Sequence, residues 1–401
     1  MPAACPDAMP AACPNAMPAA CPNAMCSQPA PLLPDYGGAC LSEVVPALLR
    51  RRQERPRWLP EPAAGANQIV LLVLDGLGWE QLAARRPMVP ALAAMVGGPV
   101  TTVAPSTTAT ALTSLTTGAT PAAHGVVGYR IEAPPGEVLN VLRWSTPAGD
   151  ARERVPPESI QPLEPFLGTK PPVVTRAEFA DSGFTGAHLA GSELHGWRYP
   201  STLVVHVGAL AAEGHELVYA YYPGIDAVAH EFGFGQAYDA ELVAADRLVN
   251  DVLAVLPAGA ALVVVADHGQ VDVGERVVRF HPDVLELTTL LTGEGRFRWL
   301  HARPGLAGRL LDVTRRHHGD MAWVDTRAEL VAGGWLGGAA AADVAARLGD
   351  VAVVAHAPVA FADPADTGSY HLQCRHGSLT AAEMLVPLVA AWGTNGGGSG
   401  T

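Results

Sequence analysis

Charged side chains are scarce in this sequence, and lysine is almost missing. Only 16% of the 401 residues are Asp, Glu, Lys or Arg, and Lys170 is the single lysine. The formal net charge of −13 argues against binding to a nucleic acid duplex, because phosphate backbones select for clustered basic side chains. With 49% apolar residues, the composition is typical of a compact globular enzyme.

Long hydrophobic runs are also missing, because Asp or Gly interrupts each strand-like stretch before it reaches the roughly 20 residues that span a bilayer. We therefore expect no membrane segment. Four of the six cysteines lie in or beside an N-terminal repeat, which leaves only Cys40 and Cys374. Two cysteines are too few for a disulfide framework, and this pattern predicts a protein of the reducing cytoplasm.

The first 24 residues repeat the motif Met-Pro-Ala-Ala-Cys-Pro-Asp/Asn-Ala three times. Dense proline opposes helix formation, and the segment has neither the basic start nor the unbroken apolar stretch of a signal peptide. We predict a disordered low-complexity segment over residues 1–30, with zinc binding by its cysteines as the alternative. A flexible tail rich in Gly is predicted at 392–401.

Between these ends, helical and strand-like patterns alternate. Strands are predicted at 68–74, 100–103, 216–222, 261–266 and 384–391, and helices at 41–52, 226–232 and 236–256. A further helix is predicted from the Pro-Ser-Thr-Thr stretch to Thr117, with Ser106 or Thr107 as its N-cap. Such alternation indicates an α/β fold with a doubly wound, mostly parallel sheet flanked by helices. We assign 41–391 to one catalytic domain, with inserted cap segments at about 129–200 and 277–350.

Two of the predicted strands end on acidic residues. The apolar run 68–74 leads to Asp75, and the run 261–266 leads to Asp267 and His268. Open α/β sheets bind their ligands at the carboxyl ends of parallel strands. Two such strand ends in one sheet suggest a shared metal site.

Three further residues extend this ligand set. Asp226 and His230 are spaced i, i+4, which places both side chains on one face of a helix; the alternative is an N-capping Asp beside an unrelated histidine. His376 stands in a loop before Gly377. Mixed carboxylate and imidazole ligands are favoured by zinc and accepted by manganese or iron.

A nucleophile is suggested by Ser106, Thr107 and Thr108, which open the helix that runs to Thr117. A hydroxyl in the first helical turn lies where backbone N–H groups and the helix dipole favour negative charge. The alternative is that these residues only cap the helix. The residues alone do not choose between Thr107 and Thr108.

Taken in order, seven motifs resemble the alkaline phosphatase superfamily and, within it, the type I phosphodiesterase/nucleotide pyrophosphatase family over about 67–391. They are Leu-Asp75-Gly76, Pro-Ser-Thr-Thr108, Leu-Thr-Thr-Gly118, Pro-x-x-His124-Gly125, Asp226-x-x-x-His230, Asp267-His268-Gly269 and His376-Gly377. The resemblance implies an alkaline-phosphatase-like fold, Thr108 as the nucleophile and two divalent metal ions, with zinc as the first choice. It assigns Asp75, Thr108, Asp267 and His268 to one metal, and Asp226, His230 and His376 to the other.

The mechanism implied by this resemblance is an in-line displacement at a small phosphate-ester substrate. Thr108 would attack phosphorus, and water would then hydrolyse a phospho-threonine intermediate, so that phosphodiester or pyrophosphate bonds are cleaved. The alternatives are a phosphomonoesterase or phosphonate hydrolase with the same site, or a non-catalytic metal-binding protein. A sulfatase is disfavoured, because the nucleophile segment has no cysteine.

The sequence departs from the family in two places. Nucleotide-cleaving relatives carry an aromatic residue after the nucleophile, whereas this chain has Ala109. They also place an asparagine that binds a phosphate oxygen soon after the His-Gly motif, where this chain has Tyr129 and Arg130. Either residue is a candidate substitute for this asparagine, with a structural role as the alternative. Four aromatic residues of the first predicted insertion are candidates for a leaving-group pocket, with core packing as the alternative for each: Trp144, Phe166, Trp197 and Tyr199.

Overall fold

The structure is a computed structural model that describes residues 28–366 and 372–395. The chain divides into Met1–Ala30 and Pro31–Thr401, and the fold below is that of the second unit. Nearly all of the low-complexity segment predicted at 1–30, and residues 396–401 of the predicted tail, lie outside the described residues. Among the described residues, no helix is both long and apolar enough to cross a membrane.

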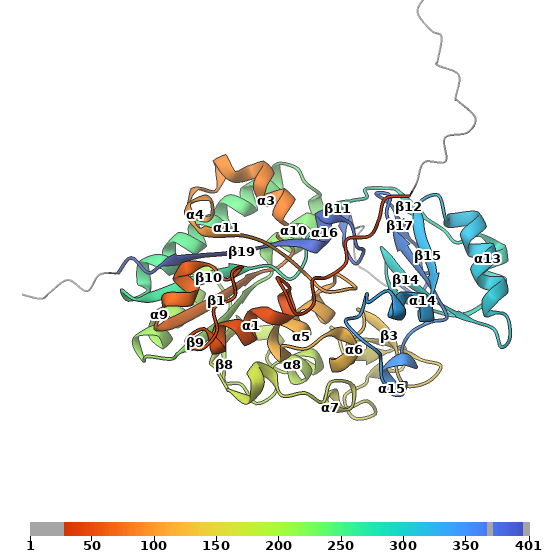
Figure 1. The fold of residues 1–401 in the computed structure, drawn as a ribbon, viewed down its shortest axis with the longest axis horizontal. Helices are drawn as coiled ribbons and strands as arrows, with labels where there is room; N and C mark the ends of the chain where they lie inside the picture. Colours follow the sequence, from red (N-terminus) through yellow and green to blue (C-terminus); the bar gives the residue numbers. More distant parts are fainter. Residues whose placement is uncertain (1–27, 367–371, 396–401) are drawn as a thin grey trace, which may run out of the picture. The chain divides into compact units, whose positions relative to one another are not determined.

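A seven-stranded sheet forms the centre of this unit (Figure 1). In order across the sheet, its strands are β2 (Val96–Thr101), β19 (Leu385–Trp392), β10 (Ala260–Val265), β1 (Gln68–Leu74), β9 (Leu217–Tyr222), β7 (Val173–Arg176) and β8 (Leu194–Trp197). The five strands from β10 to β8 are mutually parallel, and β19 is antiparallel to both β10 and β2. The predicted mostly parallel sheet is confirmed, with one antiparallel strand near an edge.

Apolar runs explain why β1 and β10 occupy the middle of the sheet. Residues of β10 are all buried, and so are all residues of β1 except the first. A strand covered on both faces needs such a continuous apolar sequence. The predicted bounds of these two strands agree with the structure to within one residue.

Helices cover both faces of the sheet, as Figure 1 shows, with α3, α4 and α11 on one side and α1, α5 and α8 on the other. Their bounds are α1 (Leu41–Arg50), α2 (Glu61–Gly65), α3 (Trp79–Arg85), α4 (Pro90–Ala94), α5 (Thr108–Thr117), α6 (Pro121–His124), α8 (Gly183–His188), α9 (Pro200–Ala212), α10 (Gly224–Phe232), α11 (Gln236–Val255) and α16 (Ala381–Met384), with a 3-10 turn η1 (Arg86–Met88). Helix α11 packs on α9, α4 and β10, whereas α1 packs on α5. This is the flanked, doubly wound arrangement that the sequence predicts.

The region 129–200, predicted as an insertion, is only partly separate from the central sheet. Its first half forms a small sheet of β3 (Arg130–Glu132), β4 (Val138–Asn140), β5 (Ser145–Thr146) and β6 (Gly149–Asp150), followed by α7 (Pro157–Ile160) and η2 (Pro165–Gly168). Its second half supplies β7, η3 (Ala177–Phe179), α8 and β8, and both strands pair in the central sheet. Strands β7 and β8 have four residues each, too short to give a clear periodic pattern.

Packing in the core accounts for three of the four aromatic residues considered for a leaving-group pocket. Trp144, Phe166 and Trp197 are at most 2% exposed, whereas Tyr199 is 69% exposed. Phe166 lies edge-on to Tyr219. The core-packing alternative therefore holds for these three residues.

The region that follows β10 builds a second sheet with its own core. This sheet has the order β13 (Thr288–Glu294), β14 (Phe297–Ala302), β16 (Val351–Ala355) and β15 (Ala322–Thr326), and all of its pairs are antiparallel. It is accompanied by α12 (Pro282–Glu286), α13 (Ala307–His318), α14 (Arg327–Ala332) and α15 (Ala342–Ala345). Because β16 reaches Ala355, this sheet extends past the predicted limit of 350.

Two short strand pairs lie in the segments that connect the second sheet to the central sheet. Strand β11 (Val271–Asp272) pairs with β18 (Cys374–Arg375), and β12 (Val277–Val278) pairs with β17 (Ala360–Phe361).

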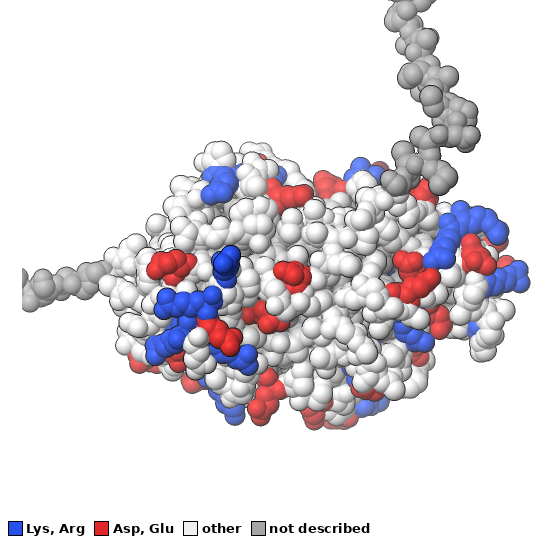
Figure 2. All heavy atoms as spheres, viewed as in Figure 1, with Lys and Arg blue, Asp and Glu red and all other residues white. Residues whose placement is uncertain are grey.

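On the face drawn in Figure 2, basic and acidic side chains form small mixed groups separated by uncharged surface. The sparse charge of the sequence is therefore spread over this face.

A buried ion pair joins the second sheet to α16. Arg296 donates from Nε and Nη2 to the two carboxylate oxygens of Glu383 at 2.8 and 2.9 Å, and neither side chain is exposed. Glu383 also accepts a hydrogen bond from the Ser378 N–H at 2.9 Å, and its carbonyl accepts one from the Gly269 N–H at 2.8 Å. Glu383 thus connects the loop after His268 to the loop after His376.

We expect Glu383→Ala to lower the free energy of unfolding of the metal-free protein by about 3–5 kcal/mol, because Arg296 would keep a buried charge without a counter-ion. Urea unfolding followed by tryptophan fluorescence measures this loss. Glu54→Ala, at an exposed position, is the control and should change stability by less than about 0.5 kcal/mol. A loss below about 1 kcal/mol for Glu383→Ala would contradict the anchoring role of this pair.

Candidate active site

The carboxyl ends of β1 and β10 meet at one edge of the central sheet, since the two strands are parallel neighbours. Asp75 follows β1 directly, and Asp267 and His268 follow β10 after one further residue. Asp267 is held by its Oδ1, which accepts hydrogen bonds from the N–H groups of Gly76 and His268, both at 3.0 Å. Its Oδ2 is buried and has no hydrogen-bond partner.

Asp75 is arranged in the same way. Its Oδ2 accepts a hydrogen bond from the Tyr221 hydroxyl, while its Oδ1 is buried without a partner. Asp75 and Asp267 are 2% and 0% exposed. Burial, followed by the charges of Asp267 and Asp226, raises the pKa of Asp75 well above its usual range. Two buried carboxylates with free oxygens that face one another form a site that attracts a cation.

Thr108 occupies the first position of α5, where Thr107 is the N-cap residue. Neither Thr107 nor its neighbours make the predicted side-chain cap. The Thr108 hydroxyl instead lies 3.1 Å from Nε2 of His268. The structure therefore brings Thr108, and not a capping hydroxyl, to the metal-ligand residues.

Three histidines are oriented alike around this edge. The Nδ1 atom of each lies against a backbone carbonyl: His230 on Cys374 at 2.7 Å, His268 on Gly269 at 3.1 Å, and His376 on Ser106 at 3.0 Å. A carbonyl oxygen can only accept, so Nδ1 carries the proton and Nε2 keeps its lone pair. This is the usual outer partner of a metal-binding histidine.

Close packing of these rings favours a neutral His376. The rings of His268 and His376 stack with centroids 3.6 Å apart, and His230 lies 5.2 Å from His376. Burial, then the neighbouring His268 and His230, lowers the pKa of His376 well below its usual range. A neutral imidazole is the form that binds a metal ion.

Asp226 and His230 share one face of α10, as their spacing predicts, with Oδ1 of Asp226 3.3 Å from Nε2 of His230. Because the N-cap of α10 is Pro223, the N-capping alternative for Asp226 is wrong. Gln270 donates to the same Oδ1 at 2.9 Å. Asp226 is thus fixed by both a predicted ligand and a residue that the sequence did not single out.

The potential ligand atoms gather into two overlapping groups. One contains Asp75, Asp267 and His268, and the other contains Asp226, His268 and His376, with all atoms of a group within 4.8 Å of one another. His230 joins the second group through Asp226. All six ligands and the nucleophile expected from the sequence therefore lie together, and carboxylate oxygens beside imidazole Nε2 atoms fit divalent cations.

Sequence reasoning did not single out several residues that lie near the predicted ligands. Tyr221 and Gln270 each hold one of the predicted carboxylates, and their positions at the end of β9 and directly after Gly269 could have indicated this. Glu294 gave no such signal, because it comes from the second sheet. Its Oε2 accepts from the Tyr129 N–H at 3.0 Å, and burial raises its pKa to about 8.

Tyr129 and Arg130, considered as substitutes for a family asparagine, both have structural partners. The Tyr129 hydroxyl accepts from the Asn140 side chain at 2.6 Å. Arg130 forms ion pairs with Asp363 and Asp366. These contacts support the structural alternative for both residues.

A third group of potential metal ligands lies in the region of the second sheet and consists of His281, Asp283 and His317. The two imidazole rings stack in parallel, 3.7 Å apart at 7°, so their in-plane lone pairs do not converge on one point. Nδ1 of His281 also accepts from the Asp283 N–H as a helix cap. This geometry is poorer for a metal than that at the ends of β1 and β10.

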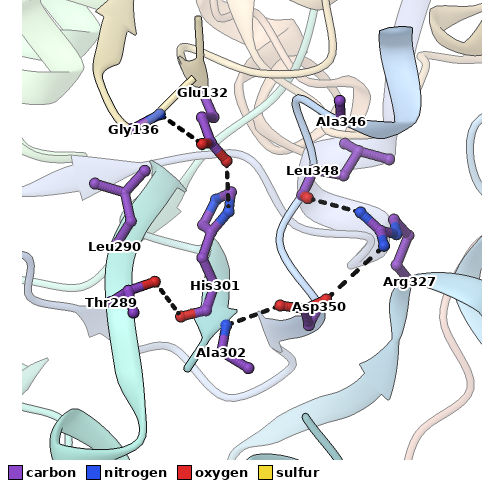
Figure 3. A pocket seen from close by; sticks show the side chains of 10 residues that line it. All are labelled: Glu132, Gly136, Thr289, Leu290, His301, Ala302, Arg327, Ala346, Leu348 and Asp350. Atoms are coloured by element: carbon purple, nitrogen blue, oxygen red, sulfur yellow. Dashed lines mark hydrogen bonds and ion pairs between the residues drawn. The ribbon is translucent and has the colours of Figure 1, made fainter. Parts of the chain in front are cut away.

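A cavity of about 470 Å³ lies away from these ligands, between the small sheet and the second sheet (Figure 3). Its charged side chains are paired with one another: His301 lies 2.9 Å from Glu132, and Arg327 lies 3.8 Å from Asp350. None of the predicted metal ligands lines it. The chemistry therefore points to the strand ends and not to this cavity.

The family model of the type I phosphodiesterases / nucleotide pyrophosphatases matches residues 69–208 and 194–379. The chain belongs to this family of phosphoric ester hydrolases, whose fold and candidate metal ligands have just been described. No curated protein sequence matches the chain significantly.

Solved structures with this fold include two enzymes. Murine ectonucleotide pyrophosphatase / phosphodiesterase 5 is similar with a TM-score of 0.61 and 14% identity, over 80% of this chain and 87% of that one. Phosphonoacetate hydrolase from Sinorhizobium meliloti 1021, in complex with phosphonoformate, has a TM-score of 0.58 and 17% identity, over 81% and 90%. At these identities the likeness establishes the alkaline-phosphatase-like fold.

We expect Asp75→Asn to stabilise the metal-free protein at pH 8 by at least about 1 kcal/mol, since the amide removes the repulsion with Asp267 and can donate to its free Oδ2. The raised pKa of Asp75 means that the folded state holds the proton more tightly. Stability of the metal-free wild type therefore falls as pH rises from about 4, and the advantage of the variant should vanish near pH 4.

Thermal unfolding with EDTA, and again with excess zinc, measures both effects. The wild type should gain stability with zinc, and Asp75→Asn should lose most of this gain. Asp251→Asn, at an exposed position of α11, serves as the control. If Asp75→Asn destabilised the metal-free protein, the carboxylate pair would not be a strained cation site.

Proposed function

We propose that this protein cleaves phosphodiester or pyrophosphate bonds of small substrates through a covalent intermediate on Thr108. Family membership supports a phosphoric ester hydrolase, and members of this family typically depend on divalent metals. The observation that carries the proposal is the placement of Thr108, 3.1 Å from His268, beside two groups of metal ligands that share this histidine.

Two sets of side chains at this site would each hold one metal ion. Asp75, Asp267 and His268, with the Thr108 hydroxyl, would hold one ion, and Asp226, His230 and His376 the other. When bound, the two cations would supply positive charge that lowers the pKa of a coordinated hydroxyl and stabilises developing negative charge on phosphate oxygens. Zinc is our first choice because the ligands mix carboxylates with neutral imidazoles.

The chain contributes orientation and electrostatics to the reaction. Thr108 sits at the N-terminus of the ten-residue helix α5, where exposed N–H groups and the helix dipole favour an alkoxide and the incoming phosphate. Attack of its Oγ1 on phosphorus would expel the leaving group in line and esterify Thr108. Hydrolysis of this ester by water would regenerate the hydroxyl.

One solved relative supports the role of the threonine. An inactive threonine-to-alanine variant of the murine phosphodiesterase was solved in complex with AMP. In this chain, Thr108 is the hydroxyl residue that lies beside the metal-ligand histidine. We propose the same nucleophilic role for it, and nothing in this role requires a serine-histidine-aspartate triad.

A phosphonate is the second candidate substrate, and Ala109 favours it. Ala109 is buried and carries only a methyl group, so it offers no aromatic face on which a nucleotide base could stack. Phosphonoacetate hydrolase is among the similar structures, and one was solved with phosphonoacetate itself. The same Thr108 and metal ligands would serve a C–P bond as well as a P–O bond.

We also propose that the protein works in the cytoplasm. Cys40 and Cys374 are buried and unpaired, which suits a reducing compartment. Neither thiol is placed to take part in the chemistry: burial raises the pKa of both, that of Cys374 to about 12. Fractionation of the native host cells with an antibody against the protein tests this location.

We expect Thr108→Ala to reduce turnover of bis-p-nitrophenyl phosphate by at least about 1,000-fold, with zinc or manganese present, because the variant has no group to esterify. EDTA should abolish wild-type activity. Thr107→Ala removes the neighbouring hydroxyl from the same turn and should stay within about tenfold of the wild type.

Two outcomes would change this assignment. Equal losses in Thr107→Ala and Thr108→Ala would argue that the turn, and not one nucleophile, matters. Faster wild-type turnover of p-nitrophenyl phosphate than of the bis-ester would favour a phosphomonoesterase, and release of phosphate from phosphonoacetate would favour the second candidate. A metal-loaded wild type that turns over none of these compounds would support a non-catalytic metal-binding protein.

A further inference from the structure

Three arginines lie between the second sheet and the loop that carries His376. Arg130 pairs with Asp363 and Asp366. Arg298, which is fully buried, pairs with Asp366 and lies 3.9 Å from Asp363. The third arginine, Arg375, therefore faces a cluster whose two carboxylates are already shared by two guanidinium groups.

The side chain of Arg375 makes no hydrogen bond or ion pair with any residue of the described ranges 28–366 and 372–395, although its backbone pairs with Val271 in the β11–β18 ladder. Its Nε is buried and has no hydrogen-bond partner. The residue as a whole is half-buried. A guanidinium has five N–H donors and keeps its charge in proteins. Leaving the buried Nε without an acceptor is costly, so the position favours an anionic partner.

The backbone fixes where this cation lies. Arg375 ends β18 and is bonded directly to the metal-ligand residue His376. Its side chain passes over Gly295, where an added Cβ would come within 2.9 Å of the guanidinium Nη1. The close approach to a glycine places the guanidinium beside the turn between β13 and β14, next to Glu294.

Glu294 stands next to Gly295 but does not neutralise this cation. Its Oε2 accepts from the Tyr129 N–H, and its Oε1 is buried without a partner. A Cβ added at Gly377 would lie 3.2 Å from this Oε1, so the carboxyl group borders the loop of His376. With a pKa near 8, Glu294 is mostly protonated at neutral pH and can donate a hydrogen bond there.

We propose that Arg375 is a specificity-determining residue that binds a second anionic group of the substrate, a phosphate or a carboxylate, borne by the part that leaves. This inference rests on the proposed function of the adjoining metal site. It narrows the substrate class to compounds that carry a second acidic group one or two bonds away from the reacting phosphorus. Diphosphate diesters and phosphonocarboxylates are such compounds. Simple aryl diesters lack the second anion and would use the metal site alone.

Binding of three small phosphonates, measured by calorimetry on the zinc-loaded protein, separates the two anion sites. Methylphosphonate offers one acidic group, phosphonoformate adds a carboxylate, and methylenediphosphonate adds a second phosphonate. We expect Arg375→Met to weaken phosphonoformate, methylenediphosphonate or both by tenfold or more, because a charge-assisted hydrogen bond is lost. Methylphosphonate should weaken by less than threefold.

Two further variants guard against a structural effect. Arg375→Lys keeps the charge and should recover part of the lost affinity, although it cannot reproduce the planar donor pair. Arg316→Met, on the exposed surface of α13, should bind all three ligands as the wild type does. Thermal unfolding of each variant checks that it is folded.

The comparison gives a definite answer in each case. A loss confined to phosphonoformate identifies a carboxylate as the second group, and a loss confined to methylenediphosphonate identifies a phosphate. Equal weakening of all three ligands, or of none, would overturn the proposal. Because the assay measures binding, a wild type that binds as expected but turns over no substrate would refute the proposed hydrolase and leave the role of Arg375 standing.

Discussion

The repulsion between Asp75 and Asp267 is the constraint on which the rest of the site depends. Both carboxylates are buried at the ends of neighbouring parallel strands, and each keeps one oxygen without a hydrogen-bond donor. Backbone N–H groups and the Tyr221 hydroxyl hold the other oxygens. The fold therefore fixes two carboxyl groups close together in a site where a divalent cation is the natural partner.

Hydrogen bonds to the backbone also orient the three histidines of the site. Each of the three histidines donates a hydrogen bond from Nδ1 to a backbone carbonyl, which leaves its Nε2 available as a ligand atom. The carbonyls belong to residues far apart in the chain, and Glu383 with Arg296 ties the loop after His268 to the loop after His376. The second sheet thus supports the site although it supplies none of the predicted ligands.

Sequence reasoning found the centre of the fold because β1 and β10 are continuous apolar runs that stop on acidic residues, and strand direction alone then brings their ends together. It found Asp226 and His230 because helical spacing is local. The choice of Thr108 over Thr107 needed the family resemblance, since both hydroxyls fit the first turn of α5.

Other features depend on contacts between distant residues and could not be predicted in this way. Strands β7 and β8 are four residues long, and the sequence predicts this region as an insertion. The sharing of His268 between both ligand groups arises from residues far apart in the chain, and the approach of Glu294 to the loop of His376 arises only when the second sheet packs against it. The number of zinc ions bound per chain tests the account most directly, by equilibrium dialysis and elemental analysis. We predict two ions in the wild type and one in His230→Ala, and a wild type that binds one ion or none would contradict the two-metal site.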